Sequence, residues 1–272
     1  MSTLIIEGGH RLSGVVDVEG NKNAALPLMA ATLLTRETCV LHNVPRIADV
    51  DVMARLLLDV GAVISVSLFE RHRDTEETLG LPPNSLRWMG PLAPETDPLW
   101  QSMQRDEISE REYWARRARE LGEAVGEPGW DMLAMLTRLR HTDPNAVVRP
   151  GIKQLIRRAH ALGIRVSILS NELELFYGRE FLSRMDVLRD IDGIVDASRT
   201  KILKPDPRAY AMAIDMMRMK AHEILFVDDQ FRNIAGAVKA GLQVHFFDLR
   251  DVPGQLAAVA ARLGPSEKEK LT

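Results

Sequence analysis

Two adjacent carboxylates, Asp228 and Asp229, follow directly on the apolar run Ile224–Val227. The residues after them have a helical pattern that ends at Gly241. In open α/β sheets, functional groups gather where a strand ends and the chain turns into a helix. Two carboxylates this close repel each other unless a cation lies between them, and oxygen ligands of this kind suit Mg²⁺. The pair therefore predicts a magnesium site at the end of a strand.

Other segments place polar groups in similar positions. The apolar run 164–169 ends in Ser170 and Asn171, a hydroxyl and an amide that suit an oxyanion. Lys204 precedes a helical pattern and supplies a compact positive charge, and a further apolar stretch ends at Asp59. One acidic site at a strand end collects groups from neighbouring strand ends, so we expect these side chains to converge.

In chain order these groups are Asp, Ser-Asn, Lys and Asp-Asp. The order and the contexts resemble the haloacid dehalogenase-like hydrolase superfamily. Its four motifs are a nucleophilic aspartate, a Ser or Thr, a Lys and a terminal acidic pair. The resemblance covers about residues 55–265 and implies an α/β fold, a Rossmann-like parallel sheet. We interpret residues 66–148, which proline and glycine punctuate, as a helical cap inserted after the first catalytic strand.

The resemblance implies a role for each motif. Asp59 would attack phosphorus and form an aspartyl phosphate. Ser170 and the backbone around Asn171 would hold a phosphoryl oxygen, and Lys204 would balance the negative charge. The implied Mg²⁺ ligands are Asp59, the main-chain carbonyl of Gly61, Asp228 and Asp229. The leading expectation is a Mg²⁺-dependent phosphatase that acts on a small phosphorylated metabolite.

Gly61 departs from the common pattern of that superfamily. Most of its phosphatases carry a second aspartate two residues after the nucleophile, where it serves as general acid and base, and a subset reads Asp-x-Gly. Loss of general acid–base catalysis typically costs on the order of 10² to 10⁴ in rate.

The first 54 residues have a different character. Segments 8–16, 20–27 and 43–50 resemble the start of UDP-N-acetylglucosamine 1-carboxyvinyltransferase, in which the equivalents of Lys22 and Asn23 touch the substrates. A lysine and an amide at a helix start can meet an anionic substrate. That family also needs a second domain and a catalytic cysteine far beyond this segment. We therefore expect a small α+β segment that is either a structural remnant or a retained site for a ligand or partner.

The two resemblances overlap between Leu56 and Ile64. Interpreted as part of the transferase, this region belongs to a helix whose apolar stripe ends at Gly61. Interpreted as part of the hydrolase, Leu56–Leu58 is the central strand and Asp59 lies at its end. The sequence that follows favours this interpretation. The helical alternative removes the nucleophile and predicts a catalytically impaired binding or assembly protein. A third hypothesis is an enolpyruvyl transferase-related protein that binds a UDP-sugar.

Composition excludes several classes of protein. With 46% hydrophobic residues, the 272-residue chain can form one large or two small domains. A net charge of −3 gives no sign of nucleic-acid binding. Arg116, Arg117 and Arg119 lie beside acids such as Glu110, a pattern typical of a solvated helix face.

Cysteine content and apolar runs bear on location and assembly. A single cysteine, Cys39, excludes a disulfide framework and suits a reducing cytosol. Neither a membrane span nor a signal peptide is predicted, so we expect a cytoplasmic protein. The open strand edge of a partial transferase unit could pair with a second copy, so a homo-oligomer is a further expectation.

Overall fold

The computed structural model describes residues 55–140 and 142–264, all of which belong to one compact unit. The predictions for Lys22 and Asn23, and for the rest of residues 1–54 and 265–272, lie outside the described residues. No helix in the described ranges is long and apolar enough to cross a membrane.

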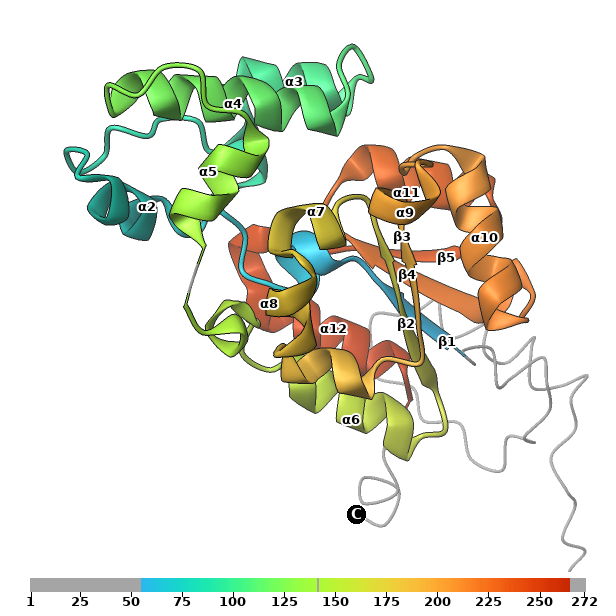
Figure 1. Ribbon diagram of the computed structural model, residues 1–272. Coiled ribbons are helices and arrows are strands. Elements are labelled where there is room, and N and C mark those ends of the chain that lie inside the picture. The colour runs from blue at the N-terminus through green and yellow to red at the C-terminus, as the bar shows by residue number, and fades with distance from the viewer. Residues whose placement is uncertain (1–54, 141, 265–272) are drawn as a thin grey trace, which may run out of the picture. The chain divides into compact units, whose positions relative to one another are not determined.

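Five parallel strands form a single sheet in the order β3-β2-β1-β4-β5 (Figure 1). The strands are β1 (Arg55–Leu58), β2 (Arg165–Ser170), β3 (Gly193–Asp196), β4 (Ile224–Asp228) and β5 (Gln243–Phe246). Strand β1 lies at the centre, and Leu58 is in register with Ile168 of β2 and Val227 of β4. The carboxyl ends of β1, β2 and β4 therefore lie side by side.

Helices cover both faces of the sheet (Figure 1). Alternate residues of β1 point to opposite faces, so Leu56 and Leu58 pack in one core cluster with α6 and α12, and Leu57 packs in another with α10 and α11. The covering helices are α6 (Ile152–Ala161), α10 (Pro207–Met217), α11 (Phe231–Lys239) and α12 (Val252–Arg262). The α/β class with a Rossmann-like parallel sheet is thus confirmed.

Shorter helices complete this layer. They are α7 (Leu173–Tyr177), α8 (Arg179–Ser183), α9 (Ala197–Thr200), η5 (Pro144–Val147), η6 (Asp186–Asp190), η7 (Ala221–Glu223) and η8 (Leu249–Asp251).

Residues 56–64 resolve the conflict between the two sequence interpretations. Leu56–Leu58 is fully buried between two neighbouring strands, as a central parallel strand requires. Asp59 is extended, and a short π-helical turn, η2 (Val60–Ile64), follows it. The helical interpretation, a stripe that ends at Gly61, is wrong for Leu56–Leu58, because hydrogen bonding to β2 and β4 holds these residues as a strand.

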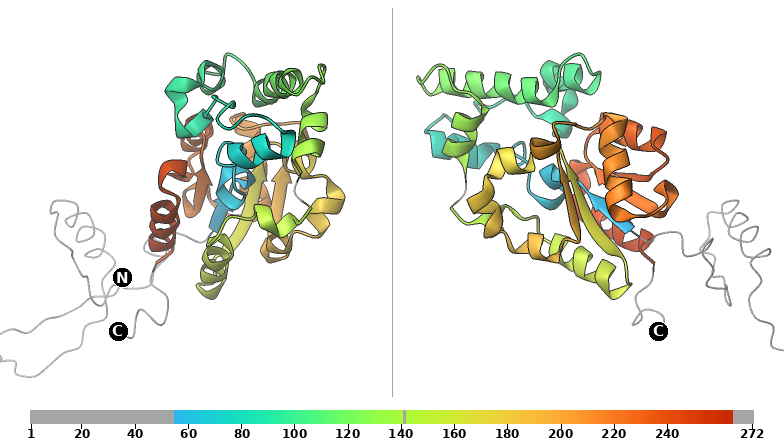
Figure 2. Two further views of the ribbon diagram at one scale, coloured as in Figure 1. Left: turned by 90° about the vertical axis from the view of Figure 1, so that its left-hand side faces the viewer. Right: turned by 45° about the vertical axis from the view of Figure 1, so that its right-hand side comes forward.

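The cap is a separate helical layer over the carboxyl edge of the sheet (Figures 1 and 2). The chain leaves the sheet layer after Ser65 and is back in it by η5, and Ser65 pairs with Val148 in an isolated antiparallel bridge. The two ends of the inserted segment therefore lie next to each other at the edge of the sheet layer. Its helices are α2 (His72–Leu79), η3 (Gly90–Leu92), η4 (Pro94–Thr96), α3 (Pro98–Gln104), α4 (Glu110–Ala124) and α5 (Met132–Leu139).

The cap has its own core, and the prediction for Arg117 in it was wrong. Arg117, expected on a solvated face, is only 7% exposed. Its guanidinium forms an ion pair with the fully buried Asp97 and lies 5.1 and 5.2 Å from the ring centroids of Trp88 and Tyr113. The charge pattern of the helix could not reveal this, because Asp97 lies on a different element.

Helix α4 begins at Glu110. Ser109 caps it and accepts a hydrogen bond from the backbone N–H of Glu112. Glu110 is consequently the first helical residue, where a negative charge is favoured by the helix dipole. This start places the Glu110 side chain at the end of α4 that faces the sheet.

Candidate active site

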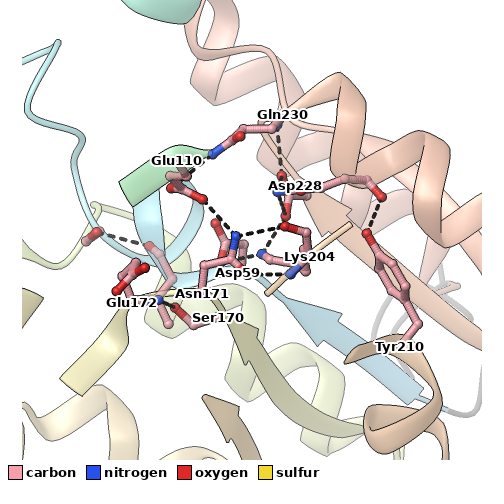
Figure 3. A network of polar contacts seen from close by, with 12 residues as sticks. Asp59, Glu110, Ser170, Asn171, Glu172, Lys204, Tyr210, Asp228 and Gln230 are labelled. Carbon is pink, nitrogen blue, oxygen red and sulfur yellow. Dashed lines mark hydrogen bonds and ion pairs between the residues drawn. The ribbon is translucent and has the colours of Figure 1, made fainter. Parts of the chain in front are cut away.

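Asp59 and Lys204 meet at the carboxyl edge of the sheet (Figure 3). The backbone N–H of Asp59 donates to the carbonyl of Val227 at 3.0 Å, which fixes the end of β1 against β4. The Nζ atom of Lys204 lies 2.8 Å from Oδ1 of Asp59 and 2.7 Å from Oδ2 of Asp228. Lys204 is 1% exposed. One buried cation therefore bridges the ends of two adjacent strands.

Three buried carboxylates gather at this point. Asp59, Asp228 and Asp229 each contribute an oxygen, and these atoms all lie within 4.8 Å of one another. Burial raises the pKa of Asp59 to about 7, Lys204 opposes the rise and the charge of Asp228 adds to it. Burial and the charges of the other two aspartates raise the pKa of Asp229 well above its usual range. Three acids beside one lysine leave excess negative charge, and an all-oxygen donor set fits Mg²⁺.

Asp228 is the most enclosed of the three acids. Its carboxylate accepts from the backbone N–H of Gln230 at 2.8 Å and from Nδ2 of Asn233 at 3.0 and 3.1 Å. Sequence reasoning missed Asn233. The available signal was its position in the first turn of α11, just after the acidic pair, where its amide can reach back to the strand end.

Ser170 and Asn171 lie at the end of β2, and both are 5% exposed. The Asn171 side chain holds the Lys204 backbone. Its Oδ1 accepts from the Lys204 N–H at 2.6 Å, and its Nδ2 donates to the Lys204 carbonyl at 3.2 Å. This side chain orders the lysine loop, and Ser170 and Asn171 both line the cavity beside it.

Gly61 lies in the turn after Asp59 and lines the same cavity. Its φ of −60° and ψ of 126° are open to any residue. A Cβ at this position would approach only Oδ2 of Asp59, at 3.6 Å. The missing carboxylate is therefore not excluded by the backbone or by space.

Arg149 fixes the turn that carries Gly61, and sequence reasoning missed it. Its guanidinium donates to the carbonyl of Ala62 through Nε at 3.1 Å and Nη2 at 2.6 Å, and it forms an ion pair with Glu70 at 2.6 Å. Ala62 has a φ of 64°, a left-handed conformation that costs an L-residue about 1–2 kcal/mol. The buried arginine holds this turn and both ends of the cap insertion together.

A cavity of about 130 Å³ lies between the sheet edge and the cap. Asp59, Ser170, Lys204 and Asp229 line it from the sheet side. The cap contributes mainly apolar side chains, which include Phe69, Trp100, Trp114, Leu136 and Leu139. The cavity is thus polar at the strand ends and largely apolar on the cap side, where Arg71, Glu110 and Arg140 are the charged residues.

Two glutamates join the cap to the sheet layer at this cavity. Glu110 accepts from Nδ2 of Asn171 at 2.7 Å and from Nε2 of Gln230 at 3.2 Å (Figure 3). Glu172 forms an ion pair with Arg111 of α4 at 2.6 Å, and burial raises its pKa to about 7 against the opposing effect of Arg111. Glu110 was interpreted from sequence as part of a solvated helix face, and this was wrong because its partners lie outside the cap.

Comparison with known proteins identifies relatives for two parts of the chain. A family model described as EPSP synthase (3-phosphoshikimate 1-carboxyvinyltransferase) matches residues 6–83. The UDP-N-acetylglucosamine 1-carboxyvinyltransferase of Bradyrhizobium diazoefficiens is 55% identical over 58 residues, or 21% of this chain and 14% of that protein. The enzyme of Gloeobacter violaceus is 57% identical over 58 residues, or 21% and 13%. The chain matches only about one seventh of the length of these relatives.

Solved structures resemble the hydrolase part. The HAD-hydrolase YfnB from Bacillus subtilis, in a form bound to magnesium, aligns with a TM-score of 0.56 and 17% identity over 72% of this chain and 86% of that one. The L-2-haloacid dehalogenase RSc1362 aligns with a TM-score of 0.52 and 18% identity, with the same coverage. At these identities the similarity shows the fold alone.

The haloacid dehalogenase-like hydrolase family model matches residues 92–241, more than half of the chain. This range contains Ser170, Lys204, Asp228 and Asp229 but begins after Asp59, which falls in the transferase match. The tertiary structure nevertheless joins Asp59 to the other four residues through β1, as the ordered motifs predict. The chain therefore belongs to the haloacid dehalogenase-like hydrolase family.

Proposed function

We propose that this hydrolase is a Mg²⁺-dependent phosphatase that acts on a small phosphorylated metabolite through an aspartyl-phosphate intermediate. The observation that carries the proposal is the contact of Lys204 with Asp59 and Asp228 at 2.8 and 2.7 Å, with Asp229 completing a cluster of three acids. Phosphoryl transfer needs this combination of a carboxylate nucleophile, a fixed cation and a place for a metal ion.

The three clustered acids support magnesium binding. Asp59, Asp228, Asp229 and the main-chain carbonyl of Gly61 would hold the ion. When bound, the ion would neutralise negative charge on the phosphoryl group and on the carboxylates.

The residues of the chain divide the remaining work. In the first step, an Asp59 oxygen bonds to phosphorus while the bond from phosphorus to the leaving oxygen breaks. The Ser170 hydroxyl and the backbone N–H groups around Asn171 donate to the phosphoryl oxygens. Lys204 favours the ionised form of Asp59 and orients its carboxylate. In the second step, water bonds to phosphorus, inorganic phosphate leaves and the Asp59 carboxylate is restored.

The cavity supports a small substrate. Its volume of about 130 Å³ is roughly ten times the 10–15 Å³ that one water needs by the same measure. Apolar side chains of the cap would contact the leaving group, while charged groups at the strand ends would contact the phosphoryl group. We propose that the cap thereby selects substrates by the apolar part of the leaving group.

Phosphate release tests the proposed function. The wild-type protein should release inorganic phosphate from a generic aryl phosphate with Mg²⁺, and addition of EDTA should abolish the release. Asp59→Asn should lower turnover by at least about 10³-fold, because it removes the nucleophile. Asp186→Asn, which changes an exposed acid far from the cavity lining, is the matched control. Undiminished turnover by Asp59→Asn would reject the assigned nucleophile, and an inactive wild type on a broad phosphate panel would reject the phosphatase.

Two other functions follow from the sequence hypotheses. A binding or assembly protein without its first strand is not favoured, because β1 is present and central. The match to the transferases favours a second proposal, UDP-sugar binding through Lys22 and Asn23. Calorimetric titration of the full chain with UDP-N-acetylglucosamine tests it, with Lys22→Ala as the comparison. Absence of heat in the wild type would dispose of this binding.

A further inference from the structure

Hydrolysis of a phosphate ester moves two protons, and the turn after the nucleophile offers no group for them. An alkoxide leaving group needs a proton as its bond to phosphorus breaks, and the attacking water must lose one. Gly61 has no side chain for either task. Among the described residues that line the cavity, the carboxylates are Asp59, Asp229, Glu110 and Glu172. Asp59 and Asp229 already have roles in the proposed function, so the choice lies between the two glutamates.

We propose that Glu110 is the general acid and base of the reaction, supplied by the cap in place of a side chain at position 61. This inference rests on the proposed phosphatase function. Glu110 lines the cavity together with Asp59, and its carboxylate points toward the Asp59 and Asn171 side chains (Figure 3). Its charge is among the causes that raise the pKa of Asp59 and of Asp229, which is consistent with this proximity.

The partners of Glu110 suit a group that gains and loses a proton. Each oxygen accepts one hydrogen bond from a neutral amide, Asn171 at 2.7 Å and Gln230 at 3.2 Å. Each carboxylate oxygen has two acceptor sites, so one site on each remains for a proton. Glu172 differs, because its Oε1 is held by the guanidinium of Arg111 at 2.6 Å. Glu172 is also not among the main charges that shift the pKa of Asp59 and of Asp229, whereas Glu110 acts on both.

The proton path balances over the two steps. In the first step, the Glu110 carboxyl gives its proton to the leaving oxygen as that oxygen separates from phosphorus and Asp59 bonds to it. In the second step, the Glu110 carboxylate takes one proton from water while the water oxygen bonds to phosphorus and the bond from Asp59 breaks. Phosphate leaves, Asp59 is a free carboxylate again, and Glu110 is again protonated.

The variant Glu110→Gln separates the acid role from the base role. With an aryl phosphate, whose leaving group departs without a proton, the variant should give a burst of one aryl alcohol per site within about tenfold of the wild-type rate. Steady-state turnover should then fall by about 10² to 10⁴ because the second step lacks its base. Intact mass spectrometry should detect the phosphoryl group accumulated on the protein. With an alkyl phosphate the burst itself should be lost, because the first step lacks its acid.

A residue that only fastened the cap would give a different result. The burst with the aryl phosphate would then slow as much as the steady state, and no phosphoryl group would accumulate. Glu112→Gln, which changes an exposed glutamate of the same helix paired with Arg116, is the control and should keep wild-type kinetics.

Rescue from the usual position gives a second, independent test. Gly61→Asp is compatible with the backbone, and its Cβ would come no closer than 3.6 Å to Oδ2 of Asp59. Added to Glu110→Gln, it should restore steady-state turnover at least about tenfold by supplying the missing carboxyl group. One outcome rejects the role of Glu110 but keeps the proposed phosphatase function. In that outcome the wild type is active, Asp59→Asn is inactive, and Glu110→Gln retains wild-type turnover. If the wild type is inactive on every phosphate ester, both fail.

Discussion

Individual buried charges set the electrostatic balance of this site. Lys204 is a fully buried cation that contacts two buried carboxylates, Asp59 and Asp228. Breaking a buried ion pair by removing one partner typically costs about 3–5 kcal/mol, because the other charge is left without compensation. The lysine is therefore as important to the fold of the strand ends as to any chemistry that occurs there.

Lys204→Met should lower the free energy of unfolding of the metal-free protein by about 3 kcal/mol. Mg²⁺ should recover part of this loss, because a bound cation again compensates Asp59 and Asp228. Urea unfolding with EDTA and with Mg²⁺ measures both effects. Lys239→Met, at an exposed position of α11, should change stability by less than about 0.5 kcal/mol. Equal stability of the two variants would contradict the assigned role of Lys204.

Among the elements, the turn after β1 combines an unusual backbone conformation with support from a side chain far away in the chain. It contains the left-handed Ala62, lies at the start of the cap insertion and depends on Arg149 from the point where the insertion ends. Two backbone hydrogen bonds, from Val66 to Val147 at 2.9 Å and from Arg149 to Ile64 at 2.8 Å, join the two ends directly. The position of Asp59 is thus linked to the two ends of the cap insertion.

Arg149→Met should cost about 3 kcal/mol, because it leaves Glu70 without its ion-pair partner and the Ala62 carbonyl without the two guanidinium donors. Turnover should also fall, since the turn carries Gly61 and orients Asp59, although Arg149 itself is not among the cavity-lining residues. Thermal unfolding and phosphate release measure the two effects. Arg157→Met, at an exposed position on α6, is the matched control. A stable Arg149→Met variant with normal turnover would show that the turn keeps its conformation without Arg149.

At the scale of the whole molecule, the described residues contain separate cores. Two lie on the faces of the sheet, and the third, rich in aromatic residues, lies within the cap. Polar contacts at the cavity, such as Arg111 with Glu172 and Glu110 with Asn171, connect the cap to the sheet layer. Because buried acids lie at these contacts and at the proposed metal site, we expect stability to depend on pH and on Mg²⁺.

The metal-free protein should lose stability as the pH rises from about 4 to about 7. Asp59 and Glu172 each have a folded-state pKa raised to about 7, so in this window the folded state binds more protons than the unfolded state. The free energy of unfolding then falls with rising pH. Mg²⁺ should offset the loss, since it binds the ionised acids. The increase in Tm on adding Mg²⁺ should accordingly be larger at about pH 7.5 than at about pH 5, and the reverse order would contradict the metal site.

The amino-acid sequence by itself determined the fold class and the residues that gather at the sheet edge. Apolar runs that end in Ser170 and Asp228, and a helix that begins after Lys204, are local patterns, and parallel pairing brings such strand ends together without further information. The identity and order of the main polar groups could therefore be predicted.

Only the tertiary structure decided between strand and helix at Leu56–Leu58, because pairing with β2 and β4 overrides a local pattern that suits both. It alone revealed Arg117 as buried and Glu110, Arg149 and Asn233 as parts of the site region. The partners of Arg117, Glu110 and Arg149 lie on other elements, some of them far away in the chain. A sequence pattern reports which neighbours a residue has along the chain, whereas burial and hydrogen bonding depend on neighbours that folding brings near.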